Sequence, residues 1–194
     1  MLTNHRIARG GRPWPAVTLG TAFSTAMVAL GAISLAPLVG GVFAVGFFGG
    51  LVLWLARPSE ATFQTVRAPY LAGLAAYVVH RIDEEVSGFV PDIEALTGSS
   101  AVPVLSLPSL VLVVMSLAWM ASPLLLLRGK HPLGQYGAWT LFTSFGVLEG
   151  AHFVFPLLAG GAYGYFPGMV TAPLIMATGW WGMWRMWRGG GANP

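Results

Sequence analysis

The chain has 194 residues, of which 55% are hydrophobic and 9% charged, and its mean hydropathy is +0.69. Soluble domains carry about 25% charged residues, so this composition excludes an ordinary water-soluble domain and favours a polytopic membrane protein. The net charge of +3 does not indicate nucleic-acid binding, because the ten lysines and arginines stand at the ends of apolar stretches rather than in one basic patch. The absence of cysteine excludes disulfides, thiolate metal ligands and a cysteine nucleophile.

The N-terminal part of the chain is predicted to be a basic arm followed by a helical hairpin. Residues 1–15 form the arm, and residues 16–60 contain an apolar tract of about 40 residues. One membrane span needs roughly 20 residues. Pro37 stops a helix, and the glycine pair that follows it permits a reversal. We therefore expect a two-helix transmembrane hairpin over 16–60, with spans at about 16–36 and 39–56.

The rest of the chain is predicted to form a four-helix transmembrane region over 61–188, followed by a flexible tail at 189–194. Gly88 and Pro91 mark the end of the first of these helices, and we expect a loop at 89–105. The four predicted spans are about 67–88, 106–127, 136–158 and 169–187.

The positions of the basic residues favour six spans with both termini in the cytoplasm, since cytoplasmic segments of membrane proteins carry an excess of lysine and arginine. With the N-terminus inside, only Arg81 falls toward the outer side. The other nine basic residues then lie inside: Arg6, Arg9, Arg12, Arg57, Arg67, Arg128, Lys130, Arg185 and Arg188. The predicted fold class is an all-α polytopic transmembrane bundle.

The segment from His80 to Glu85 holds three of the seven acidic residues and ends an apolar run. On a helix, His80 shares a face with Asp83 and Glu84, which follow it by three and four residues. Arg81 and Glu85 are four residues apart on a neighbouring face, and we expect them to form a structural salt bridge. Ionisable residues inside membrane spans usually mark functional sites, so the first three residues are site candidates.

A second ionisable pair, Glu149 and His152, lies three residues apart within the span at 136–158. His80 lies thirteen residues beyond Arg67, and Glu149 lies thirteen beyond Tyr136. Both positions are therefore roughly 20 Å along their helices. We expect the two pairs to meet in one layer, in the outer half of the membrane.

Such a layer supports two chemistries. The first is acid–base catalysis by His80, Asp83, Glu84, Glu149 and His152 on a lipid, isoprenoid or other apolar substrate. The second is metal binding, because His80, Glu84, Glu149 and His152 suit zinc or non-haem iron, and Glu-x-x-His occurs in di-iron helix bundles. Two further readings stay open. In one, these groups only hydrogen-bond the two helices together; in the other, the chain is a non-catalytic subunit of a larger membrane complex or a carrier.

Two motifs carry a resemblance to a known family. Residues 80–84 (His-Arg-Ile-Asp-Glu) resemble the His-x-x-Glu-Glu motif of the HXXEE-domain proteins, which are small bacterial integral membrane proteins. His152 and residues 165–171 (Tyr-Phe-Pro-Gly-Met-Val-Thr) are similar to that family's downstream histidine and its Tyr-x-Pro-Gly-x-x-Thr signature. Asp83 replaces the first glutamate of the motif, which keeps the charge but shortens the reach.

The resemblance covers about residues 62–187 and leaves the first two spans outside it. It implies a multi-pass protein of the bacterial inner membrane and a role for His80, Asp83, Glu84 and His152, but no particular reaction. The expected partners are the lipid bilayer and an apolar or lipid substrate, with no nucleic acid. A homo-oligomer or a larger membrane complex is compatible with the sequence.

Overall fold

The structure, a computed structural model, describes residues 12–57 and 59–188, and the regular elements in these ranges are all helices. The predicted all-α class is therefore confirmed for the described residues. Most of the predicted arm at 1–15 and the predicted tail at 189–194 lie outside them. The elements are α1 (Trp14–Ser34), α2 (Pro37–Ala56), α3 (Phe63–Ser87), α4 (Phe89–Thr97), α5 (Leu107–Ala121), η1 (Ser122–Arg128), α6 (Pro132–Val147), η2 (Leu148–Gly150), α7 (Ala151–Leu158) and α8 (Ala172–Arg188).

Four helical segments of the described chain are long and apolar enough to cross a membrane, which indicates a membrane protein. They are Trp14–Ser34, Pro37–Ala56, Leu107–Arg128 and Pro132–Leu158. The other two predicted spans correspond to α3 and α8. Five of the 25 residues of α3 are charged, and α8 has only 17 residues. The count of six spans and the cytoplasmic termini therefore stay predictions.

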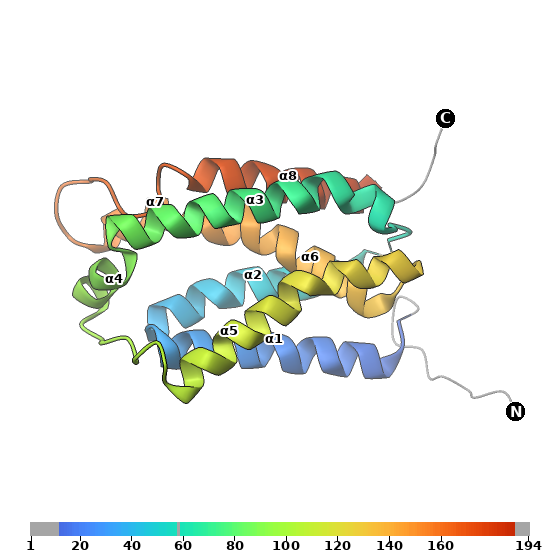
Figure 1. The fold of residues 1–194 in the computed structure, drawn as a ribbon, viewed down its shortest axis with the longest axis horizontal. Helices are drawn as coiled ribbons and strands as arrows, with labels where there is room; N and C mark the ends of the chain where they lie inside the picture. The colour runs from blue at the N-terminus through green and yellow to red at the C-terminus, as the bar shows by residue number, and fades with distance from the viewer. Residues whose placement is uncertain (1–11, 58, 189–194) are drawn as a thin grey trace, which may run out of the picture.

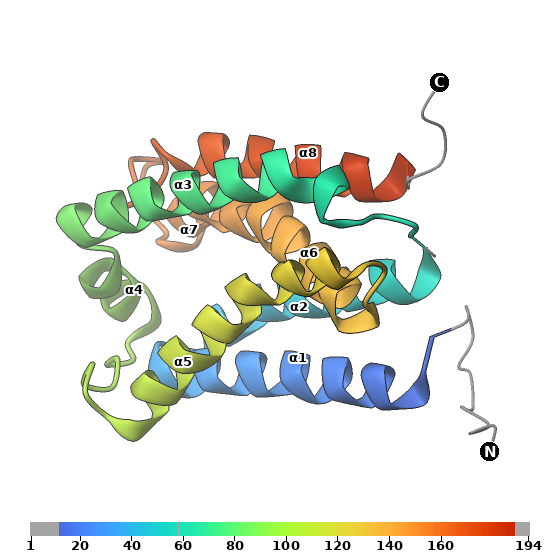
Figure 2. The ribbon, with the colours of Figure 1, turned by 45° about the vertical axis from the view of Figure 1, so that its right-hand side comes forward.

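The helices form two outer layers around α6. In both views α3 and α8 run side by side, and α1 and α2 lie on the opposite side of the bundle (Figure 1, Figure 2). α6 packs against α2 on one side and α8 on the other, and every residue from Gly134 to Gly146 is buried. The helix axes approach closely because glycines face backbone: Gly50 lies against Thr140, and Gly179 against Gly146.

The two ends of the bundle differ in chemistry. The start of α1 and the end of α8 lie at the same end (Figure 1). At that end Arg57 lies over the ring of Trp187 at 3.8 Å, and Arg185 Nε donates to the carbonyl of Thr65 at 3.1 Å. Lys130 forms an ion pair with Glu60 there. The opposite end is built from α4, α7 and the segment that connects α7 to α8 (Figure 1).

The segment predicted as a loop at 89–105 contains α4, so that expectation is wrong. Gly88 ends α3 with a φ of 83°, and α4 begins at the next residue. Pro91 does not prevent this helix, because a proline in the first turn replaces an N–H that would be unpaired anyway. Ile93 is buried against a small core that includes Phe155 and Phe166. α4 therefore closes the end of the bundle at which the ionisable residues lie.

Candidate functional site

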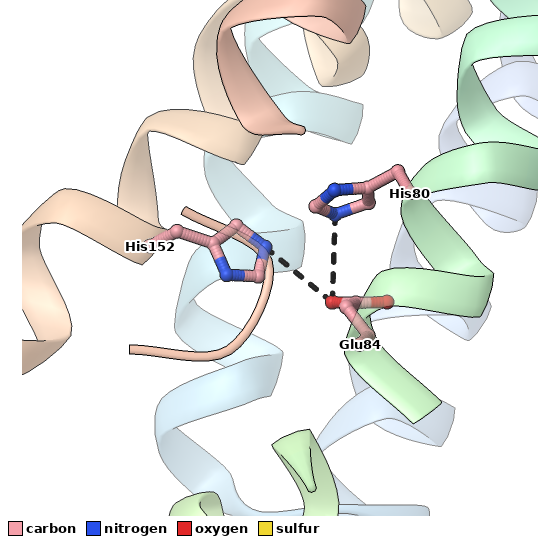
Figure 3. A group of neighbouring side chains, drawn as sticks. All are labelled: His80, Glu84 and His152. Carbon is pink, nitrogen blue, oxygen red and sulfur yellow. Dashed lines mark ion pairs between the residues drawn. The ribbon is translucent and has the colours of Figure 1, made fainter. Parts of the chain in front are cut away.

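Four buried ionisable side chains converge between α3 and the α6–α7 segment. α3 contributes His80 and Glu84, one turn apart, η2 contributes Glu149, and α7 contributes His152. Their exposed fractions lie between 1% and 7%. Figure 3 shows His80 and His152 on facing helices, both directed at the carboxylate of Glu84. These four residues are called the His/Glu cluster below.

Imidazole nitrogens and carboxylate oxygens alternate around the His/Glu cluster. His80 Nε2 lies 3.0 Å from Glu149 Oε2 and 3.5 Å from Glu84 Oε1. His152 Nε2 lies 3.4 Å from each of the same two oxygens. Each Nε2 atom therefore faces both carboxylates, and each of these oxygens faces both imidazoles.

A break between α6 and α7 positions Glu149 and His152, which form one side of the cluster. Between α6 and α7 the chain forms the 3₁₀ turn η2, which begins after Val147, a residue with φ −122° and ψ −46°. In 3₁₀ geometry, side chains three residues apart eclipse each other. Glu149 lies in this turn and His152 in the first turn of α7, and the two side chains meet, with Glu149 Oε2 and His152 Nε2 3.4 Å apart. 3₁₀ turns within helices often occur at functional positions.

Hydrogen bonds at the other ring nitrogens orient both imidazoles. His80 Nδ1 lies 2.8 Å from Thr171 Oγ1, which donates to Asp83 Oδ2 at 2.7 Å. The hydroxyl of Thr171 therefore accepts from His80 Nδ1–H. His152 Nδ1 lies 2.6 Å from the carbonyl oxygen of Pro167, which can only accept, so His152 Nδ1 also carries a hydrogen.

These bonds leave both Nε2 atoms directed at the carboxylates. His80 Nε2 is buried, and its contact with Glu149 Oε2 at 3.0 Å lacks the angular geometry of a regular hydrogen bond. An imidazole held at one nitrogen by a carbonyl or a carboxylate-linked hydroxyl, with the other nitrogen free, is typical of metal-ligating histidines.

Gly168 keeps the two imidazoles close. Its φ is +88°, and a Cβ atom at this position would lie 2.5 Å from His152 Cε1 and 2.9 Å from His80 Cε1. Any other residue would therefore suffer backbone strain and also push the rings apart. The segment that connects α7 to α8 thus belongs to the site, because its residues Gly168 and Thr171 contact the imidazoles.

Arg81 does not form the predicted salt bridge with Glu85. It pairs with Glu84 instead, through Oε2, while Oε1 of the same carboxylate faces the histidines. Spacings of three and four residues both bring side chains together on a helix. Here Glu85 is exposed, whereas Glu84 is buried and directed at the bundle interior. Arg81 therefore lies at the rim of the His/Glu cluster rather than apart from it.

The structure brings four of the five predicted catalytic candidates together, and the fifth, Asp83, lies outside the His/Glu cluster. Asp83 is half-buried and reaches His80 only through Thr171. Reasoning from spacing did not find the parts played by Thr171, Gly168 and the Pro167 carbonyl. The similarity of residues 165–171 to a family signature was the signal that pointed to this segment.

A cavity of about 130 Å³ adjoins the cluster. All four cluster residues line it, together with side chains from helices on the far side of the bundle. Its apolar lining includes Met27, Val39, Phe43, Phe47, Trp119 and Phe145. The cluster thus faces a small, mainly apolar space.

Two carboxylates and two imidazoles suit one divalent transition-metal ion. Metal–ligand distances of about 2.0–2.1 Å give a tetrahedron whose edges are about 3.3–3.4 Å. The four nitrogen–oxygen separations of 3.0–3.5 Å are close to such an edge. His80, Glu84 and His152 offer ligand atoms that all lie within 4.8 Å of one another. Glu149 falls outside that group, so its carboxylate must shift to become the fourth ligand. Arg81 pairs with Glu84, and the remaining negative charge of the two buried carboxylates also requires compensation, since unpaired buried charge is strongly unfavourable. A divalent cation or protonated imidazoles can supply it.

Comparison with protein-family models, with curated proteins and with solved structures finds no match to this chain. The resemblance to HXXEE-domain proteins therefore stays a prediction from two short motifs.

Proposed function

We propose that this chain is an integral membrane protein that binds one divalent transition-metal ion, Zn²⁺ or Fe²⁺, at His80, Glu84, Glu149 and His152. The ion acts on a lipid, isoprenoid or other apolar substrate held in the adjoining cavity. The observation that carries the proposal is the alternation of two Nε2 atoms and two carboxylate oxygens at 3.0–3.5 Å.

Two further features favour a metal over a purely structural polar network. Both histidines are held through Nδ1, so each presents Nε2 toward the centre. Because all four donors line the cavity, a bound ion would face the substrate and act as a Lewis acid.

Acid–base catalysis without a metal is the second candidate. The 3.0 Å separation of His80 Nε2 and Glu149 Oε2 is a hydrogen-bond distance, so a proton can occupy it. In that case His80 and His152 relay protons, Glu149 or Glu84 donates them, and Asp83 orients His80 through Thr171.

The proposal includes the predicted topology. With six spans and both termini in the cytoplasm, the His/Glu cluster lies in the outer half of the bacterial inner membrane. The basic residues gathered at the opposite end of the bundle support this orientation.

The test is the metal content of the full chain, purified in detergent without chelators. We expect about one zinc or iron ion per chain by elemental analysis, and recovery of that content when the chelated protein is reloaded. Less than about a tenth of an ion per chain, with no reloading, would refute the metal centre. Turnover of a lipid substrate by such metal-free protein would establish the acid–base candidate instead.

A further inference from the structure

Arg81 stands where the cavity meets the outer surface of α3. It lines the cavity beside the His/Glu cluster and also a shallow, open groove on the exposed face of the helix, whose lining residues all belong to α3. Tyr77 lines both as well, so these two side chains stand between the cavity and the groove. The Arg81 side chain is 47% exposed.

The groove itself is mostly apolar. Val78, Ile82 and Val86 line it, with exposed fractions of 57%, 59% and 81%. In a membrane protein, such a surface faces lipid chains. A guanidinium between an apolar groove and a buried polar cluster suits an amphiphile with an anionic head, because guanidinium binds phosphate oxygens in pairs.

We propose that Arg81 binds the anionic head of a membrane lipid at this junction. The first carbons of the lipid's acyl chain lie in the cavity, and the rest of the acyl chain lies in the groove against the bilayer. The proposal names the substrate class of the proposed function and rests on it in placing the head beside the metal and in the strengthening of lipid binding by the metal.

The volume of the cavity and the open shape of the groove fit this division of the lipid. An engineered apolar cavity of about 150 Å³ holds one benzene molecule. The cavity of about 130 Å³ therefore takes about six carbon atoms, not a whole acyl chain. The rest lies in the groove, which is open to the bilayer along α3.

The charges link lipid binding to the metal. Arg81 pairs with Oε2 of Glu84, whose Oε1 faces both histidines. A bound cation would share the negative charge of Glu84 and weaken its hold on Arg81, which frees the guanidinium for the lipid head. Glu85 also lines the groove and repels an anion there, so the head lies on the cavity side of Arg81. By linkage, metal and anionic lipid strengthen each other's binding.

The experiment uses native mass spectrometry of the full chain in detergent, with phosphatidylglycerol or phosphatidylcholine of identical acyl chains. We expect about a tenfold preference for phosphatidylglycerol at the tightest site. Arg81→Gln should abolish this preference, and Arg81→Lys should retain most of it because the charge is kept. Arg128→Gln, at an exposed arginine elsewhere on the surface, is the matched control and should keep it.

A second pair of variants tests the cavity without touching any charge. Ser116 lines the cavity on α5, whereas its neighbour Leu117 is 62% exposed. Ser116→Phe should fill the cavity and weaken phosphatidylglycerol binding about tenfold, whereas Leu117→Phe should bind as wild type does. Equal binding by these two variants, or an undiminished preference in Arg81→Gln, would overturn the proposal.

Parallel samples with and without Zn²⁺ separate this proposal from the proposed function. We expect Zn²⁺ to strengthen phosphatidylglycerol binding in the wild type and not in Arg81→Gln. If the protein binds neither Zn²⁺ nor Fe²⁺, the proposed metal centre fails. In that case a preference that depends on Arg81 and Ser116 still upholds the lipid site, and a preference independent of them overturns it.

Discussion

The His/Glu cluster and the packing layer around α6 are both buried, yet they bury polar groups in opposite ways. In the packing layer the hydroxyl of Thr140 donates to the carbonyl of Tyr136 in its own helix, and that of Thr178 donates to Ile175. In the cluster the Nε2 atoms and the carboxylates have no backbone hydrogen-bond partner within residues 12–57 and 59–188, and only a proton or a cation can join them. His80 and Glu84 are the clearest example, since both are buried and both are acceptors when unprotonated.

This difference indicates what each region requires from its sequence. The packing layer requires space. Gly50 and Gly179 are needed because a neighbouring backbone lies where a side chain would be, and Gly146 is needed because the side chains of Trp180 and Met183 lie there. The cluster requires chemistry, because no apolar residue of similar size would provide the donors. Changes in the packing layer should therefore alter stability and leave metal binding intact. Changes in the His/Glu cluster should alter metal binding and leave stability largely intact.

The largest expected effect is on metal binding, from Glu84→Gln. An amide in place of the carboxylate removes one donor and one negative charge, so we expect at least about a 100-fold loss of metal affinity. Zinc titration of the chelated protein measures it. The matched control is Glu85→Gln on the next residue, which is exposed and should leave the affinity unchanged. Equal affinity in both variants would remove Glu84 from the site.

Gly179→Ala should have the largest effect in the packing layer. Its Cβ would fall on the backbone of Gly146, so α8 must move away from α6. We expect a loss of about 2–3 kcal/mol in the free energy of unfolding, measured in mixed detergent micelles. Gly41→Ala is the control, because no atom lies within 4 Å of its added Cβ, and it should be neutral or stabilising. If Gly179→Ala instead lost metal at unchanged stability, the separation between the two regions would be wrong.

Gly168→Ala tests whether ring spacing matters within the cluster. The added Cβ would press on His152 and His80, so we expect metal affinity to fall by about 10–100-fold. Gly160→Ala is a matched control: Gly160 also has a positive φ, of 73°, but no neighbour within 4 Å of the added Cβ. Both variants should lose about 1–2 kcal/mol of stability from backbone strain, and only Gly168→Ala should lose affinity for zinc. A similar loss in the two would show that strain alone is responsible.

The smallest expected effect comes from Thr171→Val, which removes the hydroxyl between His80 and Asp83. The ring of His80 then loses its fixed orientation, and we expect metal affinity to fall about tenfold. Thr171→Ser keeps the hydroxyl and should bind within about twofold of the wild type. Calorimetric titration with zinc compares the two, and identical affinities would mean that Thr171 does not position His80.

The helical framework could largely be predicted from the sequence, because apolar runs of span length dictate helices. α4 could not, since Gly88 and Pro91 normally end a helix and here separate two of them. The 3₁₀ turn at Leu148–Gly150 could not be predicted either, because its residues are compatible with an unbroken helix.

The candidate site was partly predictable for similar reasons. Helical spacing placed His80 beside Glu84, and counting along the helices placed Glu149 at the same depth. Spacing could not choose between Glu84 and Glu85 as the partner of Arg81, because burial decides that pair. The contacts of Thr171 depend on the path of a non-helical segment, which no periodic pattern specifies.

The central claim is that His80, Glu84, Glu149 and His152 are the ligands of one transition-metal ion. X-ray absorption spectroscopy of the protein reloaded with zinc or iron tests it most directly. The account predicts only nitrogen and oxygen ligands at about 2.0–2.2 Å, with the outer-shell scattering of two imidazoles. A hydrated ion without imidazole scattering, or a spectrum unchanged by His80→Ala, would contradict it.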